Sequence, residues 1–148
     1  MKTKTMRTGI GGRFLAVAML ATCAFAAAAN AQSTIAGKFT LPYEVHWGKN
    51  VLPAGDYSIS LSSHGDVSFV QSANGKTAFF TAIPVKSYSD KGATALQLAV
   101  RGNERRVRSL NLPERGISLT YPPATSAERE MFAQADQVQA VPVITAGK

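Results

Sequence analysis

Apolar and polar residues alternate one by one along much of this chain, and that period-two pattern constrains the fold more than any other feature. The longest example runs from Phe39 to Trp47, where apolar side chains alternate with threonine, proline, glutamate and histidine. This period places one face of a β-strand on a core and the other in water. Pro42 cannot donate to a strand ladder, so we expect this strand to lie at a sheet edge or to be bulged there.

Six shorter apolar stretches follow, and residues typical of turns separate them. They cover residues 57–61, 67–70, 79–85, 96–100, 107–112 and 117–121. Short strands with turn signals about every ten residues are typical of a sandwich or a small barrel. The sequence therefore predicts an all-β fold, a single small sandwich or barrel-like domain of about seven strands.

Two local patterns make sharper predictions about the strands. Asn74-Gly75 is the strongest hairpin signal in the chain. A type I′ turn needs positive φ at both central residues, and these two residue types tolerate it. The step from Val107 to Leu110 breaks the alternation, so we expect a β-bulge near Arg108-Ser109.

A single short helix is expected after the strands. Ser126 suits an N-cap and acidic residues follow in the first turn, which predicts a helix from Ser126 to about Gln137. Its apolar face would contain Met131, Ala135 and Val138. Residues 138–148 then form a C-terminal tail, in which 141–144 have the pattern of an added edge strand. The core is expected within residues 37–121.

The first 31 residues have the three parts of a secretory signal peptide: a basic start, an apolar stretch and the small-x-small site Ala29-Asn30-Ala31. The basic residues are Lys2, Lys4, Arg7 and Arg13. We expect residues 32–148 to form one exported domain, periplasmic or extracellular, with no transmembrane segment. Without the signal, twelve basic residues face nine acidic ones, so the net charge falls from +7 to +3. A nucleic-acid partner is therefore not expected.

Cys23 is the single cysteine, and it lies in the apolar stretch of the signal. The mature chain would then have no disulfide and would be stabilised by burial alone. Leu20-Ala21-Thr22-Cys23 also resembles the acylation site of bacterial lipoproteins. Lipid attachment at Cys23 is the alternative, although apolar residues follow where such proteins usually have a polar tether.

Candidate catalytic and metal-binding residues are few. The mature chain has only two histidines, His46 on the polar face of a strand and His64 in a glycine turn. The run Ser62-Ser63-His64-Gly65-Asp66 contains a serine, a histidine and an acid. Adjacent residues on a strand point to opposite faces, so such local clustering does not make a triad. A zinc site usually has four ligands, often cysteine. We expect no enzyme activity, no metal and no cofactor.

The densest charge cluster is formed by Arg101, Arg105, Arg106 and Arg108. A basic hairpin suits an anionic envelope polymer or an anionic lipid surface. Charge on an edge hairpin also prevents unwanted strand pairing, and Glu104 dilutes the cluster. These four arginines are the candidate contacts for an anionic partner. The aromatic residues Tyr43, Trp47 and Tyr57 fall in register with aliphatic positions, which favours core packing over sugar stacking.

Residues 39–57 contain a recognisable signature. The run Phe39-Thr-Leu-Pro-Tyr-Glu-Val-His-Trp-Gly48, followed by Val51-Leu-Pro-Ala-Gly-Asp-Tyr57, resembles a group of small exported bacterial proteins. That group has the pattern F-x-L-P-[FY]-x-V-x-W-G…L-P-A-G-x-Y. The resemblance covers most of residues 37–145 and implies a compact exported β-domain. It carries no assigned activity and no site residues to this chain.

Two functional hypotheses follow from these features. The first is a non-catalytic secreted or cell-envelope domain that binds a surface polymer or a partner protein. The alternative is a small β-barrel carrier whose aromatic residues line a cavity for an apolar ligand. A large apolar pocket would favour the carrier. A flat basic or aromatic patch would favour the binding domain.

Overall fold

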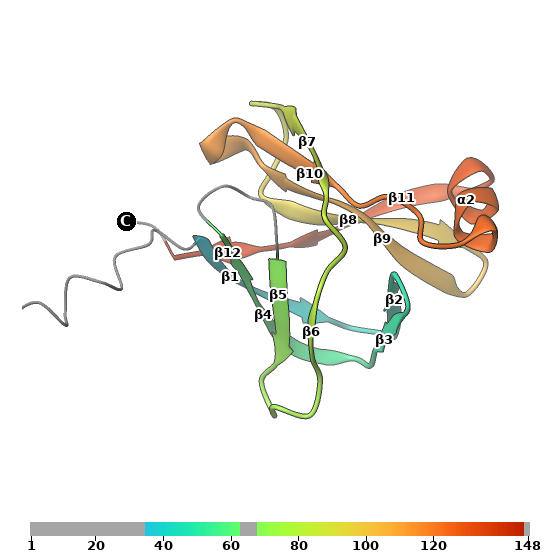
Figure 1. The fold of residues 1–148 in the computed structure, drawn as a ribbon, viewed down its shortest axis with the longest axis horizontal. Helices are drawn as coiled ribbons and strands as arrows, with labels where there is room; N and C mark the ends of the chain where they lie inside the picture. Colours follow the sequence, from blue (N-terminus) through green and yellow to red (C-terminus); the bar gives the residue numbers. More distant parts are fainter. Residues whose placement is uncertain (1–34, 63–67, 147–148) are drawn as a thin grey trace, which may run out of the picture. The chain divides into compact units, whose positions relative to one another are not determined.

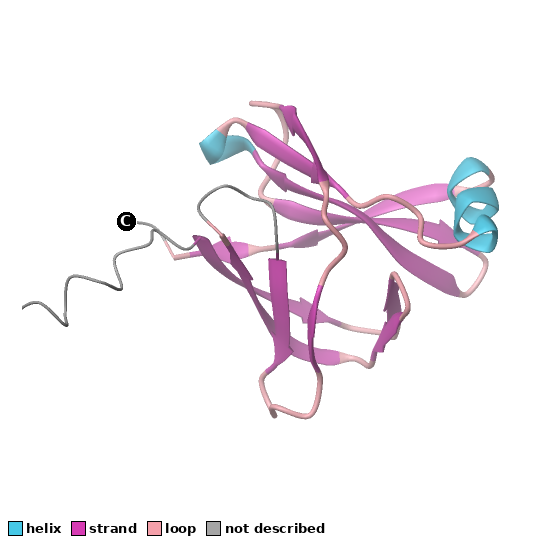
Figure 2. Ribbon diagram, viewed as in Figure 1, coloured by secondary structure: helices cyan, strands magenta, loops and turns pink. Residues whose placement is uncertain are grey.

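The computed structural model describes residues 35–62 and 68–146, which belong to one compact unit, Ser33–Lys148. Two β-sheets face each other as a sandwich, and one short helix lies near the C-terminus (Figure 1, Figure 2). The expected all-β class is confirmed, although the described residues form twelve strands in place of about seven. The expected signal peptide, Cys23 and His64 lie outside the described residues.

The first sheet has the strand order β12-β1-β4-β5-β6, and its neighbouring strands are antiparallel. Its strands are β1 (Ile35–Leu41), β4 (Gly55–Leu61), β5 (Ser68–Ser72), β6 (Ala78–Phe80) and β12 (Ile144–Thr145). Alternate residues of β1 and β4 face the interior, as their period-two pattern requires. Phe39 lies opposite Tyr57 across this pair, so the two rings stack with centroids 5.6 Å apart.

The second sheet has the order β11-β8-β9-β10-β7, and β2 joins it through a short parallel contact with β9. Its main strands are β7 (Val85–Tyr88), β8 (Ala95–Arg101), β9 (Glu104–Leu112), β10 (Ile117–Thr120) and β11 (Gln137–Pro142). The small hairpin of β2 (Val45–Trp47) and β3 (Asn50–Leu52) completes it. A 3₁₀ turn, η2 (Pro113–Arg115), connects β9 to β10.

Two of the expected strands are in fact divided between the two sheets. The stretch from Phe39 to Trp47 is not one strand, because β1 ends just before Pro42 and β2 begins at Val45 in the second sheet. Residues 79–85 divide likewise between β6 and β7, with Pro84 at the crossing. A proline has no amide hydrogen for the ladder, so both interruptions fall where the chain leaves a sheet.

The interior between the sheets is a continuous apolar cluster centred on aromatic rings. Trp47 is only 2% exposed, and its ring centroid lies 5.0 Å from that of Tyr121 and 6.1 Å from that of Phe79. Tyr43 packs against the edge of the cluster. The buried members are Phe39, Leu41, Val45, Trp47, Leu52, Tyr57, Ile59, Leu61, Val70, Leu96, Leu98, Val107, Leu110, Leu112, Ile117, Leu119, Tyr121, Val141 and Val143. Core packing of Trp47 and Tyr57 is confirmed.

The expected β-bulge in β9 is confirmed. Leu98 pairs with Val107 and Gln97 pairs with Ser109, so Arg108 is the extra residue of the bulged strand. The bulge keeps Val107 and Leu110 both on the interior face.

The expected hairpin at Asn74-Gly75 exists, but the prediction of a type I′ turn is wrong. Gly75 has a φ of 70°, whereas no described residue other than glycine has positive φ, so Asn74 does not adopt the required conformation. The Asn74 side chain instead accepts hydrogen bonds from Ser72 Oγ and from the amide of Lys76. An asparagine that bonds the backbone two residues on stabilises a longer turn without positive φ.

The helix is shorter than expected and begins with a different cap. α2 spans Ser126–Ala133, and Thr125 is its N-cap, accepting a hydrogen bond from the amide of Glu128 at 3.1 Å. Met131 is buried as expected. Val138 is not part of the helix, because residues from 137 onward pair with β8 as strand β11.

Candidate functional site

An aromatic cleft lies beside α2, where residues from both sheets meet the helix. Its volume is about 240 Å³, and the rings of Trp47, Phe80, Tyr121 and Phe132 line it together with Thr81. Trp47 comes from β2, Phe80 and Thr81 from the end of β6, Tyr121 from the residue after β10, and Phe132 from α2. We call this pocket, with these five lining residues, the aromatic cleft.

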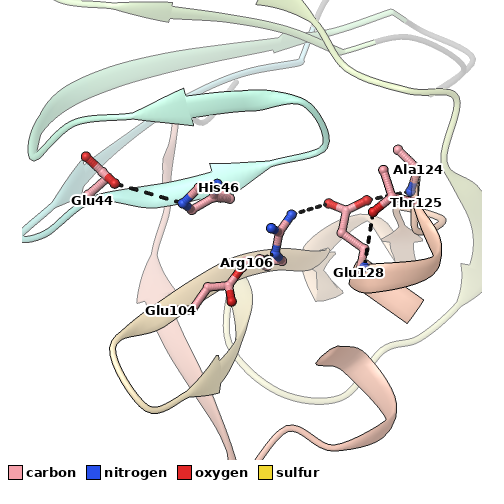
Figure 3. Close-up of polar contacts among 7 residues, drawn as sticks. All are labelled: Glu44, His46, Glu104, Arg106, Ala124, Thr125 and Glu128. Atoms are coloured by element: carbon pink, nitrogen blue, oxygen red, sulfur yellow. Dashed lines mark hydrogen bonds and ion pairs between the residues drawn. The ribbon is translucent and has the colours of Figure 1, made fainter. Parts of the chain in front are cut away.

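An ion pair attaches α2 to the second sheet beside this cleft (Figure 3). Arg106 Nη1 donates to Glu128 Oε1 at 2.9 Å, and Arg106 Nε donates to Glu104 Oε1 at 2.6 Å. The Glu128 side chain is only 3% exposed, and its second oxygen accepts from the amide of Ala124. Glu128 therefore satisfies an amide at the helix start and fixes the helix to β9 at the same time.

The four arginines of the predicted anion contact have different surroundings. Arg106 is engaged in the ion pair with Glu128, beneath the helix. The Arg105 guanidinium lies 4.0 Å from the ring centroid of Tyr43, a cation–π contact, and its Nη1 donates to a backbone carbonyl. Arg101 and Arg108 are exposed, the second on the bulge. Contact with an anionic partner stays a prediction for this set.

Tyr121 forms a buried polar contact at the aromatic cleft. Its hydroxyl lies 3.2 Å from Ser68 Oγ, and either group can donate. Burial raises the pKa of Tyr121 to about 12, and the nearby hydroxyls of Ser68 and Thr81 offset part of that effect. A phenol with this pKa stays protonated at neutral pH, where a general base would need a value near the working pH. Tyr121 is thus a hydrogen-bonding group of the core.

Two buried polar atoms at the same cleft have no hydrogen-bond partner in the described part of the chain. They are Trp47 Nε1 and Thr81 Oγ1, and both are shielded from solvent. Thr81 Oγ1 is close enough to affect the Tyr121 phenol, but their contact falls short of hydrogen-bond geometry. Because the residues come from β2 and from the end of β6, sequence reasoning did not bring them together.

The sequence contains few residues that could take part in catalysis or metal binding. His46 of β2 lies with its Nε2 3.9 Å from Oε1 of Glu44, the residue before that strand, and the pair is partly exposed (Figure 3). The Ser62, His64 and Asp66 group lies largely outside the described residues. Within residues 35–62 and 68–146, no three His, Cys, Asp or Glu side chains gather in a way that could hold a metal ion. Over the same ranges, no helix has the length and apolar character needed to cross a membrane.

A second feature is a row of exposed apolar side chains along residues 78–88, which we call the edge segment. Phe80, Ile83, Val85 and Tyr88 are between 63% and 92% exposed. The segment contains β6, at one edge of the first sheet, and β7, at one edge of the second. Ile83 and Val85 were expected to alternate within a strand, whereas Ile83 lies in the crossing and both side chains face solvent.

Comparison of the chain with models of protein families, with curated proteins and with solved structures gives no significant match. The likeness to exported bacterial proteins with the F-x-L-P signature therefore stays an expectation from the residues alone.

We predict that Arg106→Met costs more stability than Glu128→Gln. The first change leaves a buried carboxylate without its cation, which costs about 3–5 kcal/mol of unfolding free energy. The second leaves Arg106 paired with the exposed Glu104, so its cost is smaller. Urea unfolding measures both, with Arg108→Met as an exposed control expected within about 0.5 kcal/mol of wild type. An Arg106→Met loss no larger than that of the control would contradict the ion pair.

We also predict a pH dependence that belongs to Tyr121. The unfolded phenol loses its proton near pH 10, while the native phenol keeps it until about pH 12. The contribution is complete below pH 10, and the unfolding free energy then falls by about 2–3 kcal/mol as the pH rises to 12.

Tyr121→Phe lacks this part of the pH dependence, and comparing the two proteins at each pH cancels the contribution of Tyr57, whose pKa burial also raises. The measurement is urea unfolding from pH 9 to about pH 12. Parallel stability curves for wild type and Tyr121→Phe would show that the Tyr121 phenol ionises normally.

Proposed function

We propose that the protein is an exported, non-catalytic domain that binds a partner protein of the cell envelope or its exterior through the edge segment, residues 78–88. The observation that carries this proposal is the exposure of Phe80, Ile83, Val85 and Tyr88 along that one stretch. We interpret these exposed apolar side chains as an interaction surface, because their contact with water is unfavourable unless a partner covers them.

The backbone of β7 supports the same proposal. Among the described residues, β7 pairs with β10 on one side and has no strand on the other. Such an edge offers unpaired amide and carbonyl groups, and an extended segment of a partner can add to it as a further strand. Tyr88 and Val85 would then supply side-chain contacts on the two faces of that added strand.

The packed interior favours this function over the carrier alternative. The space between the sheets is occupied by the aromatic and aliphatic cluster, where a barrel carrier would have its cavity. A wider trough of about 590 Å³ exists at the first sheet, but polar side chains such as Lys38, Thr40 and Asp56 contribute to its lining.

An anionic envelope polymer is the second candidate partner, and the exposure of Arg101 and Arg108 favours it. Contacts of exposed charges weaken as salt screens them. Retention of the protein on an anionic polysaccharide that falls with salt, and that Arg101→Ser with Arg108→Ser abolishes, would support this candidate. Equal retention of both proteins would remove it.

The edge segment predicts a specific cross-linking pattern in intact cells. A photo-reactive residue in place of Tyr88 should give a discrete adduct of higher mass, because a partner covers that position. The same residue in place of Gln139, exposed on the opposite edge strand β11, should give none. Val85→Ser should lower the Tyr88 adduct severalfold without unfolding the protein, since Val85 is exposed. Absence of an adduct at 88, or equal adducts at both positions, would contradict the proposal.

A further inference from the structure

The two unpaired polar atoms of the aromatic cleft need an explanation. Trp47 is 2% exposed and Thr81 is 8% exposed, and neither Trp47 Nε1 nor Thr81 Oγ1 has a hydrogen-bond partner among the described residues. Buried polar groups are nearly always paired in native proteins, because desolvation without a partner is unfavourable. Both residues line the same cleft. Two such groups at one place indicate a site that a bound molecule completes.

The two groups define the chemistry of that molecule. An indole N–H only donates, whereas a threonine hydroxyl can donate or accept. A carbonyl oxygen has two lone pairs, so it can accept from two donors at once. Glu128 also lines the cleft, but its carboxylate is already bound by Arg106 and the Ala124 amide. Lys49 in the lining is exposed to water, so the buried part of the cleft has no free cation for an anionic ligand.

The walls define the shape of the ligand. Four aromatic rings surround a volume of about 240 Å³, below the lower end of about 300 Å³ for drug-sized pockets. Ring faces pack well against flat apolar groups. The cleft therefore suits a single ring that carries one carbonyl group.

We propose that the aromatic cleft binds a compact, uncharged carbonyl compound with a flat apolar body, whose oxygen accepts hydrogen bonds from Trp47 Nε1 and Thr81 Oγ1. Since both atoms are shielded from water, entry requires a wall residue to turn aside. Phe80 has the room to do so, because it is mostly exposed at the end of β6. Phe80 belongs both to this site and to the edge segment, so the test of the cleft uses the isolated protein without a partner.

The single tryptophan of the chain provides a direct test. A ¹⁵N-labelled exported protein has one indole N–H signal in its NMR spectrum, and the probe is benzamide. Toluene is the matched probe without the carbonyl group. Benzamide should shift the indole signal saturably and bind at least about fivefold more tightly than toluene, as expected for a hydrogen bond to a buried donor.

Thr81→Val is the matched protein variant, because it removes the hydroxyl and keeps the shape. It should lower benzamide affinity severalfold and leave toluene affinity unchanged, while the dispersion of the remaining signals shows that the fold persists. Equal affinity for the two probes, or an indole signal that benzamide does not move, would overturn the proposal. If benzamide does not move the indole signal and the indole N–H shows a cross-relaxation peak with water, a buried water is the hydrogen-bond partner of the two groups instead.

Discussion

Trp47 is the contact on which the two sheets of this protein depend. It lies on β2 of the second sheet, and its ring meets Phe39 of β1 and Phe79 of β6, both in the first sheet. Tyr121, after β10, closes the cluster with a ring centroid 5.0 Å away. The chain has a single cysteine, so no internal disulfide can share this role. Burial of these rings and their aliphatic neighbours therefore holds the sandwich together.

The filled interior restricts function to the periphery. The chain crosses between the sheets near Pro84, and the crossing leaves Phe80, Ile83, Val85 and Tyr88 at an edge that the described strands do not cover. At the helix, Arg106 neutralises the buried Glu128 and so fixes α2 beside the aromatic cleft. An apolar edge and a small cleft are two of the peripheral surfaces available for binding, and Phe80 contributes to both.

Local sequence patterns predicted the parts of the fold that depend on local rules. The alternation correctly predicted that Phe39, Leu41, Val45 and Trp47 are buried, and the broken alternation predicted the bulge at Arg108. The same alternation failed at Ile83 and Val85, because a period of two does not say whether another sheet covers the apolar face. The alternation also did not predict the change of sheet at Pro42. Leu41 before Pro42 and Val45 after it are buried in either case, so the pattern of apolar and polar residues is the same.

The candidate site could not be predicted from the sequence for a related reason. Arg106 and Glu128 are 22 residues apart, and only the packing of α2 on β9 makes them partners. In the sequence, Arg106 belongs to a basic cluster, and that local pattern predicts a contact for an anionic partner, not an internal ion pair. The residues of the aromatic cleft come from three strands or strand ends and one helix. Each has an ordinary local explanation, and their common cleft exists only in the folded chain.

The fluorescence of Trp47 tests the closed aromatic cluster most directly, because this residue is the only tryptophan. A ring that is 2% exposed should emit at short wavelength in the native protein, resist quenching by acrylamide, and shift to longer wavelength in urea. Native emission already at the unfolded wavelength, with acrylamide quenching as strong as in urea, would contradict the packing of Trp47 between the two sheets.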